Sequence, residues 1–443
     1  MRLSDYTRQA GSLQESAGGA SSFAECKRVL RERLYQDVAG ERLARLASLD
    51  RERARTELSA LVAQVAASAG LDAVGGEQLD RLIDETVDMI IGLGPLESLL
   101  LDDSVTEIMV NGPDSVFFER EGRLYTAQER FDSEAQLRLV VDRVVSPLGR
   151  RVDDQQPLVN ARLPQGHRVN VVIPPVSVQG TLLTIRKFKA RSFSLDEMVE
   201  MDSMTQPMAT LLSWAVKARK NIAVCGGTGG GKTTLLNALS REIPHDERIV
   251  TIEDAAELRF DTHPHVVRME TRMANAEGRG AVGIRDLVTN ALRMRPDRII
   301  VGECRGEETL DMLQAMTTGH DGSLTTLHAG SPREAMTRLV TMVRYGMELP
   351  TEVIEGQIVS ALDLIVQQDR VFGGGRRITQ IASRKRGFFE GGERFPYSTL
   401  VRWDKEAGAY VWERAPEWID ELVIDGLATQ EEVERWRQQV SLP

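Results

Sequence analysis

A glycine-rich run in the middle of the chain constrains the fold more than any other feature. It matches the phosphate-binding pattern G-x-x-x-x-G-K-[ST], and an apolar run at 222–225 precedes it. The loop consists of Gly226, Gly227, Thr228, Gly229, Gly230, Gly231, Lys232, Thr233 and Thr234. Leucines at helical spacing follow, so the sequence predicts a strand, a loop and a helix in that order.

This order suits an anion-binding loop. Glycines let successive N–H groups point at one phosphate, and the helix N-terminus presents its positive end to the same group. Lys232 is expected to reach the β- and γ-phosphates of ATP, and Thr233 is expected to bind Mg²⁺ through its hydroxyl. A plain glycine-rich turn is the less favoured interpretation, because it would not need a lysine and a threonine in this register.

Two apolar runs that end in acids narrow the chemistry to hydrolysis. Residues 298–303 resemble a Walker B strand, where Glu303 would hold Mg²⁺ through water. Residues 248–254 form the second run, and hydrolysis needs a carboxylate that orients or deprotonates the attacking water. Glu253 is the first candidate for this base and Glu303 the second. Asp254 and Glu257 either orient neighbouring groups or are simply solvated.

A Ser/Thr-rich run at 318–328 ends in a histidine. A lone histidine is usually structural, but His328 lies downstream of the Walker B run, where a sensor of the γ-phosphate could sit, and we favour this sensor role. His263 and His265 form a pair without a third ligand, so we interpret them as structural and not as a metal site.

The chain divides into segments of different pattern, and strands alternate with helices around the loop. Such alternation predicts an α/β protein with a doubly wound sheet and a ligand at the C-terminal ends of its strands. The expected segments are a mobile tail (1–22), a helical bundle (23–101), a small α/β domain (102–190), a linker (191–207), the ATPase domain (208–385) and a C-terminal hairpin with helices (386–443). Helix 133–145 is expected to begin at Ser133 as its N-cap.

Composition limits the function classes. The 443 residues suggest about two to four domains. The net charge of −11 argues against a generic nucleic-acid binder. Cys26, Cys225 and Cys304 form no C-x-x-C pair, which fits a reducing cytosol and predicts neither disulfides nor a zinc ribbon. No apolar run approaches the roughly 18 residues of a membrane span, so we expect a cytoplasmic protein that reaches a membrane only through partners.

The order of these four motifs resembles the secretion ATPases of the type II/type IV pilus and secretion superfamily. Residues 93–97, 105–112, 160–170 and 290–298 are more similar to one branch, the tight-adherence (Flp-type, CpaF-like) pilus motor ATPases. The resemblance covers roughly residues 83 to 381. The four-cysteine zinc module common in the type II branch is absent, and Gln165 and His167 replace an Asp and a Ser expected in their loop.

The resemblance implies a RecA-like P-loop NTPase domain, preceded by a smaller α/β N-terminal domain and a helical bundle. It also implies a homohexamer in which ATP lies between the two domains of one chain. Arg168 and Arg186 match by position the arginines of the N-terminal domain that reach the phosphates, and Arg162 and Arg272 are weaker candidates. Solvated arginines at a strand edge are the alternative.

The expected function is therefore ATP hydrolysis that drives assembly, and in one alternative also retraction, of a tight-adherence type IV pilus or a related secretion system. Platform proteins of the inner membrane are the expected partners. Three alternative functions are a type IV secretion traffic ATPase, a nucleic-acid translocase on the same core, and a catalytically dead ring. The intact residues Lys232, Thr233, Glu253 and Glu303 argue against the last.

Overall fold

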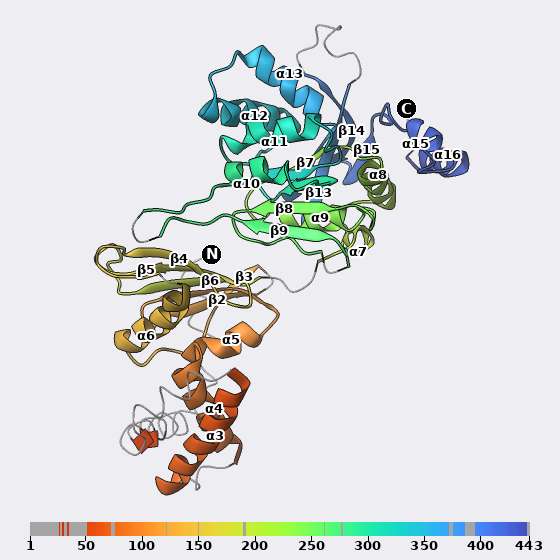
Figure 1. The fold of residues 1–443 in the computed structure, drawn as a ribbon. Coiled ribbons are helices and arrows are strands. Elements are labelled where there is room, and N and C mark those ends of the chain that lie inside the picture. The colour runs from red at the N-terminus through yellow and green to blue at the C-terminus, as the bar shows by residue number, and fades with distance from the viewer. Residues whose placement is uncertain are drawn as a thin grey trace. The chain divides into compact units, whose positions relative to one another are not determined.

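The computed structural model describes Cys26, Val29, Leu30, Arg33 and Leu34 and residues 51–71, 76–120, 122–148, 150–188, 192–260, 262–275, 278–371, 375–385 and 395–440. The expected mobile tail, residues 1–22, lies outside these ranges. The chain forms two compact units, Met1–Phe188 and Lys189–Pro443 (Figure 1). Within the described ranges, no helix is both long and apolar enough to cross a membrane.

The described residues of unit 1 include a small helical part. Helices α3 (Arg51–Ser68) and α4 (Gly76–Ile91) pack around buried leucines and valines, among them Leu58 and Leu82. Arg55 on α3 pairs with Asp84 and Asp88 on α4, which fixes the register of the two helices. The short elements η3 (Gly94–Leu96) and α5 (Glu97–Leu101) then lead into a sheet.

The sheet of unit 1 is antiparallel throughout, in the order β3-β2-β1-β6-β5-β4. Its strands are β1 (Val105–Asn111), β2 (Val116–Arg120), β3 (Arg123–Thr126), β4 (Leu158–Arg162), β5 (Arg168–Val172) and β6 (Leu182–Arg186). Helix α6 (Glu134–Val145) begins where the sequence predicts, because the Ser133 side chain accepts a hydrogen bond from the N–H of Gln136. The apolar side of α6 belongs to the core of this sheet.

Unit 2 is built on one sheet of nine strands, in the order β15-β14-β13-β12-β7-β11-β10-β8-β9. The strands are β7 (Ile222–Cys225), β8 (Ile249–Glu253), β9 (Val266–Glu270), β10 (Arg298–Val301), β11 (Leu324–Leu327), β12 (Leu364–Arg370), β13 (Arg376–Arg384), β14 (Tyr397–Asp404) and β15 (Ala409–Trp412). The run from β12 to β9 is parallel, and β13, β14 and β15 continue it antiparallel. Sequence reasoning missed β13, which joins the C-terminal hairpin to this sheet.

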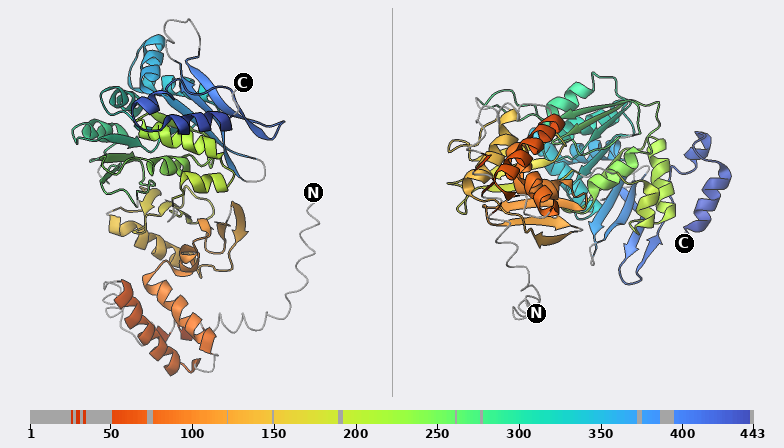
Figure 2. Two further views of the ribbon diagram at one scale, coloured as in Figure 1. Left: turned by 90° about the vertical axis from the view of Figure 1, so that its right-hand side faces the viewer. Right: turned by 90° about the horizontal axis from the view of Figure 1, so that it is seen from below.

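Helices cover both faces of the nine-stranded sheet (Figures 1 and 2). One buried cluster lies under α7 (Leu195–Glu200), α8 (Gln206–Lys217), α9 (Lys232–Ser240), α15 (Glu421–Ile424) and α16 (Gln430–Gln439). The other lies under α10 (Ile284–Ala291), α11 (Glu308–Thr317), α12 (Pro332–Gly346) and α13 (Thr351–Ala361). This layered arrangement confirms the predicted α/β class.

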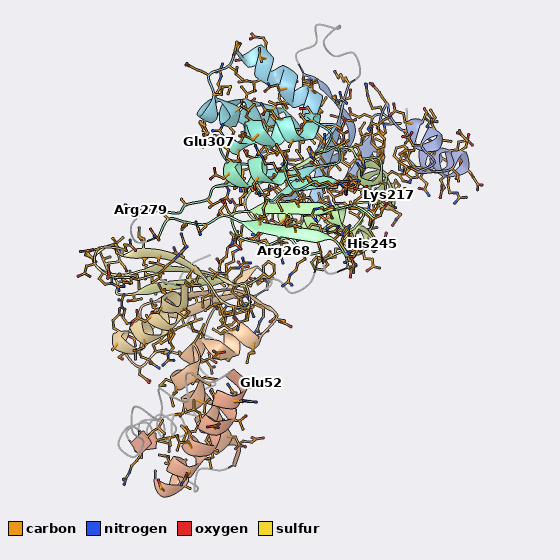
Figure 3. All side chains as sticks on the ribbon, in the orientation of Figure 1. Glu52, Lys217, His245, Arg268, Arg279 and Glu307 are labelled. Carbon is orange, nitrogen blue, oxygen red and sulfur yellow. The ribbon has the colours of Figure 1, made fainter. Side chains whose placement is uncertain are left out.

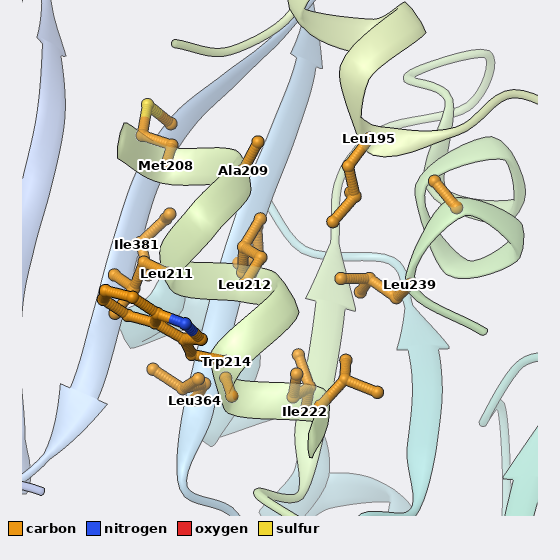
Figure 4. Close-up of a cluster of buried hydrophobic side chains, with 14 of the residues drawn as sticks. Leu195, Met208, Ala209, Leu211, Leu212, Trp214, Ile222, Leu239, Leu364 and Ile381 are labelled. Atoms are coloured by element: carbon orange, nitrogen blue, oxygen red, sulfur yellow. The ribbon is translucent and has the colours of Figure 1, made fainter. Parts of the chain in front are cut away.

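The segment expected to be a polar linker is largely a packed part of unit 2. Helix α7 starts with a capping box between Ser194 and Glu197, and its Leu195 and Met198 are buried. Figure 4 shows Leu195 beside Leu239 of α9 in the same apolar cluster. The sequence allowed a short helix at these two residues, and their burial shows how it is anchored to unit 2.

A buried ion pair lies at the start of strand β10. Arg298, the first residue of β10, is 0% exposed and bonds Glu247 through two guanidinium nitrogens. Its third nitrogen donates to the carbonyls of Val216 and Gly322, at 2.8 and 3.2 Å. A Cβ on Gly322 would lie 2.0 Å from Arg298 Nη1, so glycine is required there.

Arg298→Met is expected to lower the free energy of unfolding by about 3–5 kcal/mol, because it leaves the Glu247 carboxylate buried with a weakened set of partners. Urea titration of the purified variant measures this loss. Arg219→Met is the control: Arg219 contacts the same carboxylate at 3.2 Å but its side chain is 43% exposed, so about 1 kcal/mol or less is expected. Equal losses in the two variants would contradict the assignment.

Candidate nucleotide site

Four adjacent parallel strands of unit 2 end at one edge of the sheet, in the order β7-β11-β10-β8. The glycine loop follows β7, His328 follows β11, Glu303 lies two residues beyond β10, and Glu253 is the last residue of β8. Parallel strands place such residues together, although up to about a hundred residues separate them in the chain. Four of the predicted site residues therefore meet in unit 2.

The glycine loop is shaped by its neighbour β12 as well as by its own turns. Gly229 and Gly231 have φ values of 70° and 96°, which favour glycine. A Cβ on Gly226 would lie 2.1 Å from the backbone carbonyl of Gln368, and a Cβ on Gly230 would lie 2.9 Å from the same atom. The loop can pack against β12 only because these positions lack side chains.

The side chain of Lys232 folds back onto the backbone of the glycine loop. The residue is 8% exposed, and its ammonium donates to the carbonyls of Gly226 and Gly227 at 3.1 and 3.2 Å. The same nitrogen lies 3.3 Å from Nδ1 of His328. Burial lowers the pKa of Lys232, and the nearby Glu303 partly opposes this shift. The geometry gives a positive charge, preorganised at the mouth of the loop.

His328 lies between Lys232 of the loop and Glu303. His328 Nε2 lies 2.9 Å from Glu303 Oε1, and Arg305 donates to Glu303 Oε2. Burial and the charge of Lys232 lower the pKa of His328, which favours the neutral ring. A change at the loop can therefore reach Glu303 through one imidazole.

Glu253 lies in a different environment from Glu303. It is 3% exposed, and its Oε2 accepts hydrogen bonds from the N–H groups of Glu257 and Leu258 at 2.6 and 2.9 Å. Its Oε1 is buried and has no hydrogen-bond partner among the described residues. Burial raises the pKa of Glu253 to about 7, although the two N–H groups oppose the shift. A carboxylate with such a pKa suits a general base near neutral pH.

The residues fit Mg²⁺ only together with a nucleotide. The described residues contain no group of three or more His, Cys, Asp or Glu side chains that could hold a metal. Mg²⁺ commonly binds one or two carboxylates plus phosphate oxygens and waters, so Glu303 and the Thr233 hydroxyl suffice as protein ligands. The absence of a complete ligand set is thus compatible with Mg²⁺ that arrives with ATP.

Unit 1 carries a row of three arginines. Arg162, Arg168 and Arg186 are directly opposite one another across β4, β5 and β6. Residues in this relation share one face of a sheet, and like charges placed so are destabilising unless an anion compensates them. Arg186 is also opposite Glu107 on β1. The row includes both arginines that the sequence singled out, and Arg162 joins them.

Other candidates from the sequence have local partners. Arg272 donates to the carbonyl of Gly280 at 2.6 Å. His263 lies 3.0 Å from the carbonyl of Pro244, and His265 lies 2.6 Å from Arg248. Each of the two histidines therefore has a polar neighbour within its own part of unit 2.

Sequence reasoning missed three residues at the loop edge: Arg305, Gln368 and Arg376. Arg376, on the unpredicted strand β13, donates to the carbonyl of Gly229 at 3.3 Å. Arg305 follows Glu303 by two residues, and this nearness was the only sequence feature that could have marked it as a site residue. Gln368 and Arg376 lie more than 130 residues from the loop, so no local pattern marks them.

Comparisons with known proteins agree on one family. The family model for "Type II/IV secretion system protein" matches residues 91–372. The chain is 34% identical over 335 residues to the type IV secretion system protein VirB11 of Bartonella quintana, covering 67% of this chain and 94% of that relative. It is 36% identical over 306 residues to the conjugal transfer protein TrbB of Rhizobium radiobacter, covering 68% and 90%.

A Mycobacterium tuberculosis protein, Rv3659c, provisionally named for conjugal transfer, is 40% identical over 299 residues, which is 66% of this chain and 84% of that relative. Among solved structures, the pilus retraction motor PilT with bound ADP has a TM-score of 0.51 at 21% identity, covering 78% of this chain and 89% of that chain. This likeness concerns the fold, and it supports the RecA-like P-loop architecture.

Proposed function

The chain belongs to the type II/IV secretion system protein family and is an ATPase, and we propose that it is the hexameric motor of a tight-adherence type IV pilus. The proposal rests on one observation: Lys232, His328, Glu303 and Glu253 lie together at one edge of the sheet. The same chain has the runs at 93–112 and 160–170 that resemble tight-adherence motors. Platform proteins of the inner membrane are the proposed partners of this cytoplasmic motor.

In the proposed reaction, the glycine loop binds the ATP phosphates through its N–H groups and Lys232 neutralises the charge that develops on them. Glu253 accepts a proton from the attacking water, since its free Oε1 is a buried acceptor and its pKa is near 7. Thr233 and Glu303 would hold Mg²⁺, which neutralises phosphate charge when bound. His328 would report the γ-phosphate to Glu303.

The arginine row of unit 1 is the proposed phosphate clamp. A guanidinium is permanently charged and planar, and it bonds phosphate oxygens through two parallel N–H groups.

Arg186→Ala is expected to lower ATP turnover by at least about tenfold, because one arm of the clamp is lost. Hexamer assembly, measured by light scattering, is expected to remain. Arg123→Ala, an exposed arginine on the edge strand β3 of the same sheet, is the matched control and should change neither quantity. A variant that turned over ATP at the wild-type rate would contradict the clamp.

A type IV secretion traffic ATPase is the second candidate function, and the names of VirB11 and TrbB among the relatives favour it. Deletion of the gene, with complementation by the wild type or by Lys232→Ala, separates the two. Loss of surface pili with intact transfer supports the pilus motor. Loss of substrate or DNA transfer with intact pili would replace our proposal by the alternative.

A further inference from the structure

One guanidinium bridges two carboxylates at the edge of the candidate site. Arg305 Nη2 lies 2.5 Å from Glu303 Oε2, and its Nη1 lies 3.3 Å from Asp254 Oδ2. Glu303 Oε1 faces His328 Nε2 at 2.9 Å, so each oxygen of Glu303 has its own neighbour. Only Oε2 of this carboxylate accepts a hydrogen bond, from Arg305, because Oε1 has no hydrogen-bond partner among the described residues.

The backbone and the side chain of Arg305 are held very differently. The N–H groups of Arg305 and Gly306 both donate to Glu308 Oε1, at 2.6 and 2.8 Å, and Glu308 is 8% exposed. The Arg305 side chain is 58% exposed, whereas that of Glu303 is 18% exposed. The guanidinium can therefore swing into solvent while its backbone and Glu303 remain in place.

We propose that Arg305 is a positioning residue that stands in for the divalent cation, pairing with Glu303 until Mg²⁺ and nucleotide bind. A guanidinium and a hydrated Mg²⁺ both compensate the charge of the same carboxylate, so their binding to Glu303 Oε2 is mutually exclusive. Arg305 keeps Glu303 oriented in the resting site, and it raises the Mg²⁺ concentration needed to form the ternary complex. This inference rests on the proposed role of Glu303.

The experiment compares Arg305→Gln with Arg285→Gln. Arg285 is a matched control, because it also bridges two carboxylates, Glu307 at 3.1 Å and Asp311 at 2.9 Å, with a side chain that is 42% exposed. Its partner Glu307 is labelled in Figure 3. Binding of a fluorescent, non-hydrolysable ATP analogue is titrated with Mg²⁺, and again in EDTA, on the full chain.

In Arg305→Gln, the Mg²⁺ midpoint of analogue binding is expected to fall by about fivefold, the factor that a partly exposed ion pair can supply. Binding in EDTA should be unchanged, and Arg285→Gln should match the wild type in both. An unchanged or higher Mg²⁺ midpoint would overturn the inference. Weaker binding in EDTA would overturn it as well, because Arg305 would then contact phosphate directly.

Glu303→Ala separates a failure of this inference from a failure of the proposed site. If Glu303→Ala raises the Mg²⁺ midpoint while Arg305→Gln leaves it unchanged, Glu303 keeps its metal role and only the place-holding role of Arg305 is wrong. If Glu303→Ala has no effect on the midpoint, the metal assignment of the proposed function fails, and the inference fails with it.

Discussion

Lys232→Ala is expected to abolish ATP hydrolysis, with a rate loss of at least about a thousandfold. The ammonium is held inside the loop by the carbonyls of Gly226 and Gly227, so it is already positioned when the phosphates arrive. Its loss removes the nearest positive charge from the developing negative charge of the transition state. Phosphate release at saturating ATP measures the effect.

Lys217→Ala provides the control for that variant. Lys217 is the last residue of α8, labelled in Figure 3, and its side chain is 42% exposed and 3.8 Å from Glu242. The Lys217→Ala variant should hydrolyse ATP at the wild-type rate. Both variants should keep the circular dichroism spectrum of the wild type. Near-normal turnover in Lys232→Ala would show that the loop does not bind the reacting phosphates.

Glu253→Gln is expected to bind ATP with little change and to hydrolyse it about 10²–10⁴-fold more slowly. The glutamine preserves the shape of the side chain but cannot accept the proton of water. Single-turnover hydrolysis and analogue binding, measured on the same preparation, separate the two steps. If Glu253→Gln hydrolysed normally and Glu303→Gln did not, the roles of the two acids would be exchanged.

The pKa of Glu253 also predicts two pH dependences. Only the ionised form can act as the base, so the wild-type single-turnover rate should rise with pH through about 7. The folded pKa lies above the usual value of 4.5, so the folded protein holds a proton that the unfolded chain releases between pH 4.5 and 7. Stability from this group is therefore full below pH 4.5 and is lost as pH rises through 7.

The difference in the free energy of unfolding between Glu253→Gln and the wild type should favour the variant more at pH 8 than at pH 5. The change in this difference between the two pH values should be roughly 3 kcal/mol at most. Urea titrations of both proteins at the two pH values test this sign. If Glu253→Gln were no more stable than the wild type at pH 8, the ionised Glu253 carboxylate would not destabilise the folded protein. The pH dependence of the hydrolysis rate would then have to come from another titrating group.

The phosphate loop and the flanking acids could be predicted from sequence because strand, glycine loop and helix are adjacent in the chain. The different environments of Glu253 and Glu303 could not, since Glu253 is packed against Gly302, the residue that follows β10 on the neighbouring strand. The Arg305 bridge likewise joins residues on β10 and β8 loops that only the sheet brings together. Strand β13 was missed because its apolar residues, Ile378, Ile381 and Ala382, do not alternate with polar ones in the period of a strand.

The contact between β12 and the loop determines which loop positions tolerate mutation. A methyl group on Gly226 would collide with the carbonyl of Gln368, whereas one on Gly227 would meet no atom within 4 Å. Tolerance to alanine should therefore differ between these neighbouring glycines, even though both belong to one phosphate-binding pattern. Part of the familiar glycine spacing is thus imposed by a strand more than 130 residues away, and relatives with a different residue or backbone path at that strand would be free to vary it.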